Sequence, residues 1–144
     1  MKNKKDSILK KNDEITLEIT ALTSQGSGVG RFNSLAVFVE GTAPGDVILA
    51  HIILVKSSYA VGIIKKIIKP SKHRIVCDCG VSSSCGGCSY RHIDYGEELE
   101  IKKQRVQDAF LRIGGIDTPV KEILSGNSTS RYRNKAQYPI ALTL

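Results

Sequence analysis

Four cysteines stand within twelve residues near the middle of this chain, at Cys77, Cys79, Cys85 and Cys88. Cysteine thiolates at short spacings exchange disulfides, bind zinc or hold an iron–sulfur cluster. The last three form a Cys-x5-Cys-x2-Cys run, and three thiolates on one loop are a common form of iron–sulfur ligation. The two glycines between the final pair have no Cβ, so backbone N–H groups can approach the sulfides. We therefore predict metal ligands at Cys79, Cys85 and Cys88.

Two other interpretations of the cysteines stay open from spacing alone. One loop could wrap zinc if Cys77 joined the other three, although zinc sites usually separate their two ligand pairs by about a dozen residues or more. A redox Cys-x-x-Cys pair is disfavoured, since it usually lies in a βαβ context, and here a further cysteine stands six positions upstream. Lone histidines such as His51, His73 and His92 are more often solvated than bound to a metal.

The segment before the cysteines has the pattern of a small β-barrel. Residues 14–20 alternate between polar and apolar, as a half-buried strand does. Apolar strand patterns follow at residues 35–40, 47–55 and 59–68, with short loops between them. Residues 26–31 hold three glycines at alternate positions, which indicates a tight bend or the close approach of another backbone. About five short strands would leave exposed edges unless the sheet closed, so we predict a mainly β fold with a five-stranded OB-like barrel.

One amphipathic helix is predicted after the cysteines. Asp94 and the glutamate three positions later have the spacing of a capping box, with Asp94 as the N-cap. Apolar residues then recur at spacings of three and four through Arg112, and Gly114-Gly115 follows as a stop signal. Residues 119–124 favour a short extended element, and residues 131–140 favour a basic strand.

The charge of the chain favours a polyanionic partner. The chain has 21 Lys and Arg against 14 Asp and Glu, which gives a net charge of +7. Lys and Arg displace counterions from phosphates, although a plain solvated surface is an equal alternative for any single cluster. Near the C-terminus, basic residues alternate with Tyr132 and Tyr138, and this mixture of phosphate donors and stacking surfaces is typical of RNA contact. We predict RNA contacts at Arg31, Lys65, Lys66, Arg131, Arg133 and Lys135.

The sequence has neither of the usual signals for a membrane or for export. No apolar run approaches the ~18 residues of a membrane span. No hydrophobic signal-peptide core follows the basic N-terminus. We therefore expect a cytoplasmic monomer that does not bind membranes and whose clustered cysteines do not form a disulfide framework.

Two segments resemble known families. An alternating strand, Gly-Ser-Gly-Val-Gly-Arg at 26–31, Ala-Val-Phe-Val at 36–39 and Gly-Thr-Ala-Pro-Gly-Asp at 41–46 resemble a TRAM domain, over about residues 8–68. TRAM domains are RNA-binding modules of RNA-modifying enzymes. The Cys-x5-Cys-Gly-Gly-Cys run at 79–88 resembles the iron–sulfur segment of the RNA (uracil-5-)-methyltransferase family. A TRAM domain directly before this run makes the resemblance more specific than either part alone.

The resemblance implies a [4Fe-4S] cluster with Cys79, Cys85 and Cys88 as its three local ligands. The family's fourth ligand comes from further along the chain, and no cysteine follows Cys88 here. Cys77 is extra to the pattern and is either a bystander or a substitute ligand. The Tyr-Arg-Asn-Lys stretch at 132–135 resembles the start of the family's central domain.

The resemblance also implies an activity for a longer protein. The family transfers a methyl group from S-adenosylmethionine to C5 of a uracil in RNA, for which we expect rRNA rather than tRNA. A cysteine adds to C6 of the base and a general base removes the C5 proton. We expect these groups and the S-adenosylmethionine site beyond Leu144, so we predict no catalytic residue here and an inactive N-terminal fragment. The competing hypothesis is a stand-alone zinc-dependent RNA-binding module, and a redox-sensing regulator is a weaker one.

The same interpretation divides the chain in two. We expect residues 1–69 to form the TRAM barrel with a basic tail. We expect residues 70–144 to hold the Cys-rich iron–sulfur loop, the helix and the truncated start of an α+β central domain.

Overall fold

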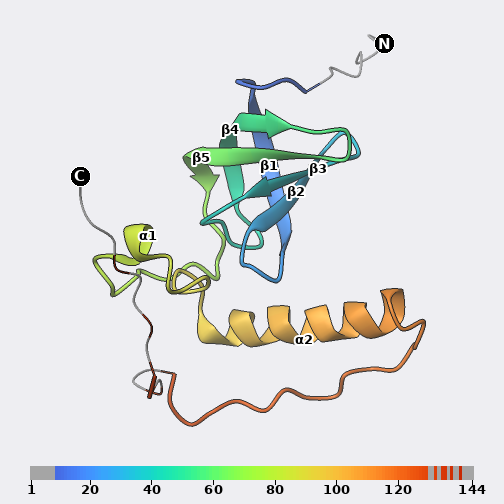
Figure 1. Ribbon diagram of the computed structural model, residues 1–144, viewed down its shortest axis with the longest axis vertical. Helices are drawn as coiled ribbons and strands as arrows, with labels where there is room; N and C mark the ends of the chain where they lie inside the picture. Colours follow the sequence, from blue (N-terminus) through green and yellow to red (C-terminus); the bar gives the residue numbers. More distant parts are fainter. Residues whose placement is uncertain (1–8, 130–131, 133, 136, 138–139, 141–144) are drawn as a thin grey trace.

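The computed structural model describes residues 9–129 together with 132, 134, 135, 137 and 140. Its N-terminal part is a closed barrel in the strand order β1-β2-β3-β5-β4, with β4 pairing back on β1 (Figure 1). This confirms the predicted mainly β fold with a five-stranded barrel. The strands are β1 (Glu14–Leu22), β2 (Gly28–Phe32), β3 (Leu35–Val39), β4 (Val47–Val55) and β5 (Tyr59–Lys69).

Alternate residues of the strands fill the barrel interior. In β1, Ile15, Leu17 and Ile19 are buried and the residues between them are exposed, as the period-two pattern predicted. Each strand has a neighbour on both sides, so closure protects the strand edges from pairing with another chain. The other strands complete the core with Val37, Val39, Ile48, Ala50, Ile52 and Ala60.

Two glycines of β2 allow neighbouring backbone segments to approach closely. A Cβ on Gly30 would lie 2.6 Å from the backbone oxygen of Glu18, and a Cβ on Gly28 would lie 1.8 Å from Thr42 Oγ1. The close approach predicted for residues 26–31 is therefore confirmed. The segment is more than a bend, however, because most of it forms strand β2.

Two helices follow the barrel, the short α1 (Ser82–Cys85) and the long α2 (Tyr95–Arg112). Asp94 caps α2 as predicted, since its carboxylate accepts a hydrogen bond from the Glu97 N–H at 2.9 Å. Helix α1 lies within the stretch predicted to be a Cys-rich loop. It ends at Gly86, whose φ of 67° is a conformation that glycine adopts without strain.

Helix α2 lies beside one end of the barrel (Figure 1). A hydrogen bond of 3.4 Å from Arg105 Nη1 to Ser24 O links it to the β1–β2 loop. No residue of α2 is buried, and several of its apolar side chains, among them Val106 and Phe110, are exposed. In the described part of the chain, no helix has the length and apolar character needed to cross a membrane.

Beyond α2, the described residues form neither helix nor strand. The extended element predicted at 119–124 is therefore not found as a strand. Instead, Gln107 of α2 ties the segment back, because its Oε1 accepts from the Val120 N–H at 2.7 Å and its Nε2 donates to Thr118 O at 2.8 Å. The described residues of 131–140 also lack the predicted strand.

Candidate functional site

The cysteines lie in a loop whose two ends meet at a narrow neck. A β-bridge joins Arg74 to Ile93. Backbone hydrogen bonds of 3.1 and 2.9 Å flank it, between residues 73–75 and residues 92–94. Ile93 is buried at this neck. Residues 76–91, with all four cysteines, form a single excursion from the neck, which we call the cysteine loop.

An ion pair fastens the neck to the barrel. Arg74 donates to the Asp46 carboxylate from Nε at 2.9 Å and from Nη2 at 2.7 Å, and Nη2 also donates to Gly41 O at 2.8 Å. Asp46 is fully buried and accepts two further hydrogen bonds, from the N–H groups of Ala43 at 2.7 Å and Ser71 at 2.8 Å. Every donor around this carboxylate is thus directed at a negative charge. We call this contact the Asp46–Arg74 clamp.

The clamp keeps Asp46 ionised although it is buried. Burial alone would raise the pKa of its carboxyl, but the hydrogen bond from Arg74 and those from two backbone N–H groups outweigh burial and lower the pKa below its ordinary value of 3.8. Asp46 belongs to the Pro-Gly-Asp turn between β3 and β4. Gly45 has a φ of 89° in this turn, a left-handed conformation that favours glycine.

The segment that leads out of the cysteine loop, residues 89–92, also contacts the barrel. His92 Nε2 lies 3.0 Å from Thr42 O, in the same turn that presents Asp46. A Cβ on Gly26 would lie 2.7 Å from Ser89 Cβ, so the β1–β2 loop packs directly against the end of the cysteine loop. Both sides of the neck below the cysteine loop are therefore held at one rim of the barrel.

His73 joins the neck to the start of α2. Its Nδ1 lies 2.8 Å from the Asp94 carboxylate, and its Nε2 lies 3.2 Å from the Glu97 carboxylate. The hydrogen bond from the Glu97 N–H, and after it the one from His73, lower the pKa of Asp94. The sequence favours a solvated His73, whereas the structure places its ring between two acidic side chains.

The structure does not gather the predicted metal ligands into one site. Cys85 and Cys88 are exposed, Cys79 is partly buried, and all three are free thiols. Among the described residues, no three Cys, His, Asp or Glu side chains lie close enough together to hold a metal ion. The thiols fit an iron–sulfur cluster by donor type and spacing, but their present arrangement is not a ligand cage. Ligation by these three cysteines stays a prediction.

Cys77 is engaged within the cysteine loop. Its Sγ lies 3.7 Å from Cys79 O. A hydrogen bond with Ser82, followed by the one with Cys79, lowers the pKa of the Cys77 thiol. The extra cysteine therefore has contacts of its own, with the backbone of the loop and the start of α1.

A cleft of about 590 Å³ lies between the cysteine loop and the barrel rim. Gln25 and Glu40 line it from the barrel, and Cys88 and Arg91 line it from the cysteine loop. Arg91 is held there by an ion pair of 2.8 Å with Asp78. A cleft of this volume with polar walls is large enough for part of a nucleotide chain.

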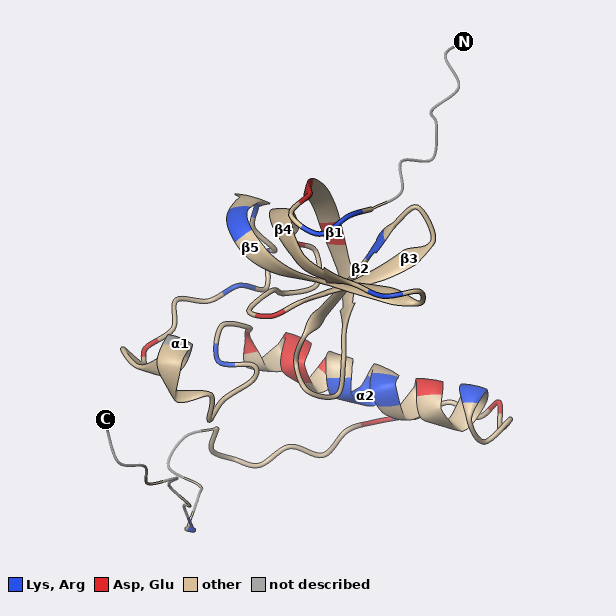
Figure 2. Ribbon diagram, turned by 45° about the horizontal axis from the view of Figure 1, so that its top comes forward, with Lys and Arg blue, Asp and Glu red and all other residues tan. Residues whose placement is uncertain are grey.

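The predicted RNA-contact residues that the structure describes come from three segments, with Arg31 on β2, Lys65 and Lys66 on β5, and Lys135 beyond α2. Figure 2 shows Lys and Arg on the barrel and along α2, where acidic residues alternate with them. Lys65 of β5 is paired with Glu14 of β1, so part of its charge is neutralised. Lys66, Arg31 and Lys135 are exposed. The two remaining predicted residues, Arg131 and Arg133, lie outside the described part of the chain.

Sequence reasoning missed the residues that fix the cysteine loop. It did not single out Arg74, and it included Asp46 only as the last residue of the segment 41–46. One signal was present, since a carboxylate that follows Pro-Gly in a turn can accept backbone N–H groups. The pairing itself joins positions 28 residues apart, which spacing rules do not reach.

The barrel matches a known domain family. The family model described as the TRAM domain matches residues 9–65, which run from just before β1 into β5. This covers most of the closed barrel and includes the turn that carries Asp46.

Curated relatives cover nearly the whole chain. A Clostridium tetani protein named as an uncharacterized RNA methyltransferase is 44% identical over 137 residues, which are 95% of this chain and 30% of the relative. A Synechocystis protein of the same description is 44% identical over 128 residues, which are 88% of this chain and 28% of the relative. The chain thus spans less than a third of these relatives' length.

Among the solved structures that are similar is the crystal structure of Pyrococcus abyssi tRNA (uracil-54, C5)-methyltransferase in complex with S-adenosyl-L-homocysteine. The match has 24% identity and a TM-score of 0.44, and covers 74% of this chain and 24% of that chain.

Proposed function

We propose that this chain is the RNA-binding part of an RNA methyltransferase, because its residues 9–65 match the TRAM domain model and its relatives are named RNA methyltransferases. The observation that carries the proposal is the closed barrel that the TRAM match covers. The net charge of +7 supports a polyanionic partner. Exposed cations such as Arg31 and Lys66 supply phosphate contacts, which position RNA without reading its sequence.

The whole protein, in this proposal, methylates C5 of a uracil with S-adenosylmethionine as the methyl donor. Its RNA is rRNA rather than tRNA, and it acts in the cytoplasm as a monomer. Residues 1–144 bind and orient the RNA, while the remainder supplies the methyl-donor site and the catalytic groups. The chain alone is therefore expected to bind RNA without methylating it.

The cysteine loop has a structural role in this proposal. Cys79, Cys85 and Cys88 are the residues that would hold a [4Fe-4S] cluster. The cluster would cross-link the loop through its thiolate ligands. The Asp46–Arg74 clamp and the His92 contact support this role, because they fix both sides of the neck to the barrel that we propose binds RNA. The thiols must come closer together for the cluster to bind.

RNA binding is tested by measuring the affinity of the chain for rRNA and tRNA fragments over a range of salt concentrations. We expect log Kd to depend steeply on log salt for the wild-type chain. The double variant Arg31→Ala, Lys66→Ala should bind more weakly and lower the slope by about one for each phosphate that is no longer neutralised. Lys121→Ala removes an exposed charge outside the barrel and is the matched control. An unchanged affinity and slope in the double variant would remove these residues from the RNA interface.

A further inference from the structure

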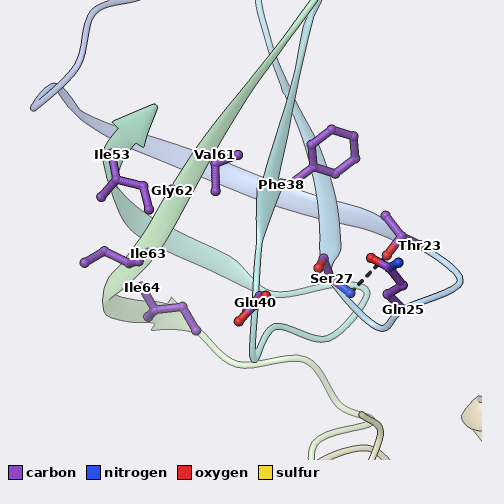
Figure 3. A pocket seen from close by; sticks show the side chains of 10 residues that line it. All are labelled: Thr23, Gln25, Ser27, Phe38, Glu40, Ile53, Val61, Gly62, Ile63 and Ile64. Atoms are coloured by element: carbon purple, nitrogen blue, oxygen red, sulfur yellow. Dashed lines mark hydrogen bonds between the residues drawn. The ribbon is translucent and has the colours of Figure 1, made fainter. Parts of the chain in front are cut away.

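A second hollow, of about 560 Å³, lies on the outer face of the barrel (Figure 3). Side chains of β3, β4 and β5 form most of it, and the β1–β2 loop borders it. The residues that matter here are the apolar Phe38, Ile53, Val61 and Ile63 and the polar Gln25 and Glu40.

Strand register turns these apolar side chains away from the core. Strands β3 and β5 pair in parallel with Phe38 opposite Val61, and the neighbours of both residues along each strand are buried. Ile53 is 40% exposed and Ile63 is 51% exposed. Single exposed apolar residues are ordinary, but several around one hollow mark a contact site.

The β1–β2 loop is a fixed border of this hollow. Ser27 N–H donates to Thr23 Oγ1 at 3.1 Å, and Thr23 N–H donates to Ser27 O at 2.8 Å. The N–H of Gly26 donates to Thr23 O at 3.0 Å. These bonds hold the loop that carries Gln25, so the border is formed before a ligand arrives.

Glu40 and Gln25 bring unused hydrogen-bonding groups to the hollow. Neither side chain makes a hydrogen bond or an ion pair with another residue in the described part of the chain. An ionised carboxylate only accepts, whereas an amide both donates and accepts. The matching ligand is flat and apolar on its faces, and carries adjacent N–H donors on one edge.

We propose that this hollow binds one unpaired guanine base of the bound RNA, an inference that rests on the proposed RNA-binding function. Guanine presents N1–H and an N2 amino group side by side, and the Glu40 carboxylate can accept both. Gln25 can donate to the neighbouring O6. The ring of Phe38 and the aliphatic walls contact the base faces, as in other sites for unstacked bases.

Other bases suit the carboxylate less well. Uracil has one N–H between two carbonyl oxygens, and these acceptors would repel the Glu40 carboxylate. Adenine and cytosine each offer a single amino donor beside a ring-nitrogen acceptor. Glu40 therefore selects guanine by hydrogen bonding and rejects uracil by repulsion between acceptors.

The hollow adjoins the cleft beside the cysteine loop. Gln25, Ser27 and Glu40 line both. An RNA strand with its guanine in the hollow can continue into the cleft, where Arg91 and Cys88 lie. The base site would thus set the register of the RNA along the path to the cysteine loop.

The test compares single-stranded RNAs of about ten nucleotides that differ at one central base, guanine or uracil. We expect the wild-type chain to bind the guanine RNA about ten-fold more tightly, as a good bidentate contact allows. Inosine, which keeps N1–H but lacks the amino group, should fall between the two. Glu40→Gln should abolish the preference, because it weakens binding of the guanine RNA and removes the repulsion that disfavours the uracil RNA. Glu18→Gln, an exposed carboxylate of β1 outside the hollow, is the matched control and should keep the preference.

Two failures of this test are distinguishable. Salt-dependent binding of both RNAs with equal affinity would overturn the base site and leave the RNA-binding function standing. No binding of any RNA would overturn both. Titration with guanosine and uridine monophosphates gives a direct check, because only the guanine nucleotide should shift the methyl NMR signals of Ile53 and Ile63. Equal shifts with both nucleotides, or none, would also overturn the base site.

Discussion

The guanidinium of Arg74 meets the carboxylate of Asp46 at 2.7 Å, and this contact joins the segment after the barrel to the turn between β3 and β4. The Asp46 side chain is fully enclosed, while 19% of the Arg74 side chain is exposed. Within the described part of the chain, each side chain is bound by the other and by neighbouring backbone groups. This ion pair, together with the His92 contact to Thr42, therefore holds the cysteine loop on the barrel.

Removing the negative charge of the clamp should destabilise the chain. Asp46→Asn keeps the shape of the side chain but leaves Arg74 without its counter-charge. We expect the free energy of unfolding, measured by urea denaturation, to fall by about 3 kcal/mol, the lower end of values for breaking a buried pair, because Arg74 is partly exposed. Hydrogen exchange in the cysteine loop should rise as well.

Glu18→Gln is the control for this experiment, since it removes an exposed carboxylate from the same barrel. Its effect should stay within about 0.5 kcal/mol. The variants Asp46→Asn and Arg74→Ala should also be less than additive when combined, because each removes the same interaction. Additive effects would show that the two side chains contribute independently.

The clamp should make stability depend on acid pH. The folded-state pKa of Asp46 lies below its ordinary value of 3.8, so the unfolded chain takes up a proton more readily than the folded chain. The stabilisation is therefore complete above that ordinary value and is lost as the pH falls through the lower, folded-state value. Asp94, whose pKa is also lowered, should add to the same loss. The measurement is the unfolding free energy between neutral and strongly acid pH.

Asp46→Asn again provides the comparison for the pH experiment. The variant should lose less stability on acidification than the wild-type chain, since it has no carboxyl to protonate at this position. Parallel curves for the two proteins would mean that Asp46 has the same pKa in the folded and unfolded chains.

The cap of α2 should be separable from the His73 contact. Asp94→Ala removes the side chain that accepts from the Glu97 N–H and should cost about 1 kcal/mol, with less helix by far-UV circular dichroism. Asp94→Ser keeps a capping oxygen but loses the charge that faces His73. If serine restores most of the stability, the cap dominates; if it behaves like alanine, the His73 contact is the larger contribution.

The contacts of this chain that could be predicted from the sequence are mainly the local ones. The alternation in β1 and the capping box at Asp94 involve residues a few positions apart, where periodicity and capping rules apply. Barrel closure followed from the need to protect strand edges. By contrast, the Asp46–Arg74 clamp and the position of His73 depend on how distant segments meet. Nothing in the residue types of Asp46, Arg74 or His73 indicates which residue each one contacts.

The candidate RNA contacts show the same limit. Lys and Arg residues can be counted from the sequence, but the sequence does not show which of them pair with an acidic residue. Lys65 and Lys66 are adjacent and look equivalent, yet only Lys65 is paired with Glu14. Likewise, the Gln25–Glu40 border of the hollow brings together a loop and a strand end, which no motif in the sequence indicates.

The close approach at Gly30 should make this position intolerant of a side chain. In Gly30→Ala, the new Cβ would lie 2.6 Å from the Glu18 backbone oxygen, so β1 and β2 must move apart. We expect a loss of about 1–3 kcal/mol, as for other overpacked sites. Gly80→Ala is the control, since a Cβ there meets no atom within 4 Å. Equal thermal stability of the two variants would mean that the barrel accommodates the extra atom without cost.

The cysteine loop gives a prediction about bound metal. The chain purified without oxygen should contain iron and acid-labile sulfide, and a chelator should remove the iron together with its visible absorption. Cys85→Ser should lower both contents strongly, because it removes a predicted ligand. Cys77→Ser separates the two alternatives for this cysteine: unchanged iron and sulfide would make it a bystander, and loss of both would make it the substitute ligand. One zinc per chain without sulfide, absent from Cys77→Ser, would instead support a four-thiolate zinc module. A chain without any metal would contradict the zinc module, and would fit a cluster whose fourth ligand is not among these residues.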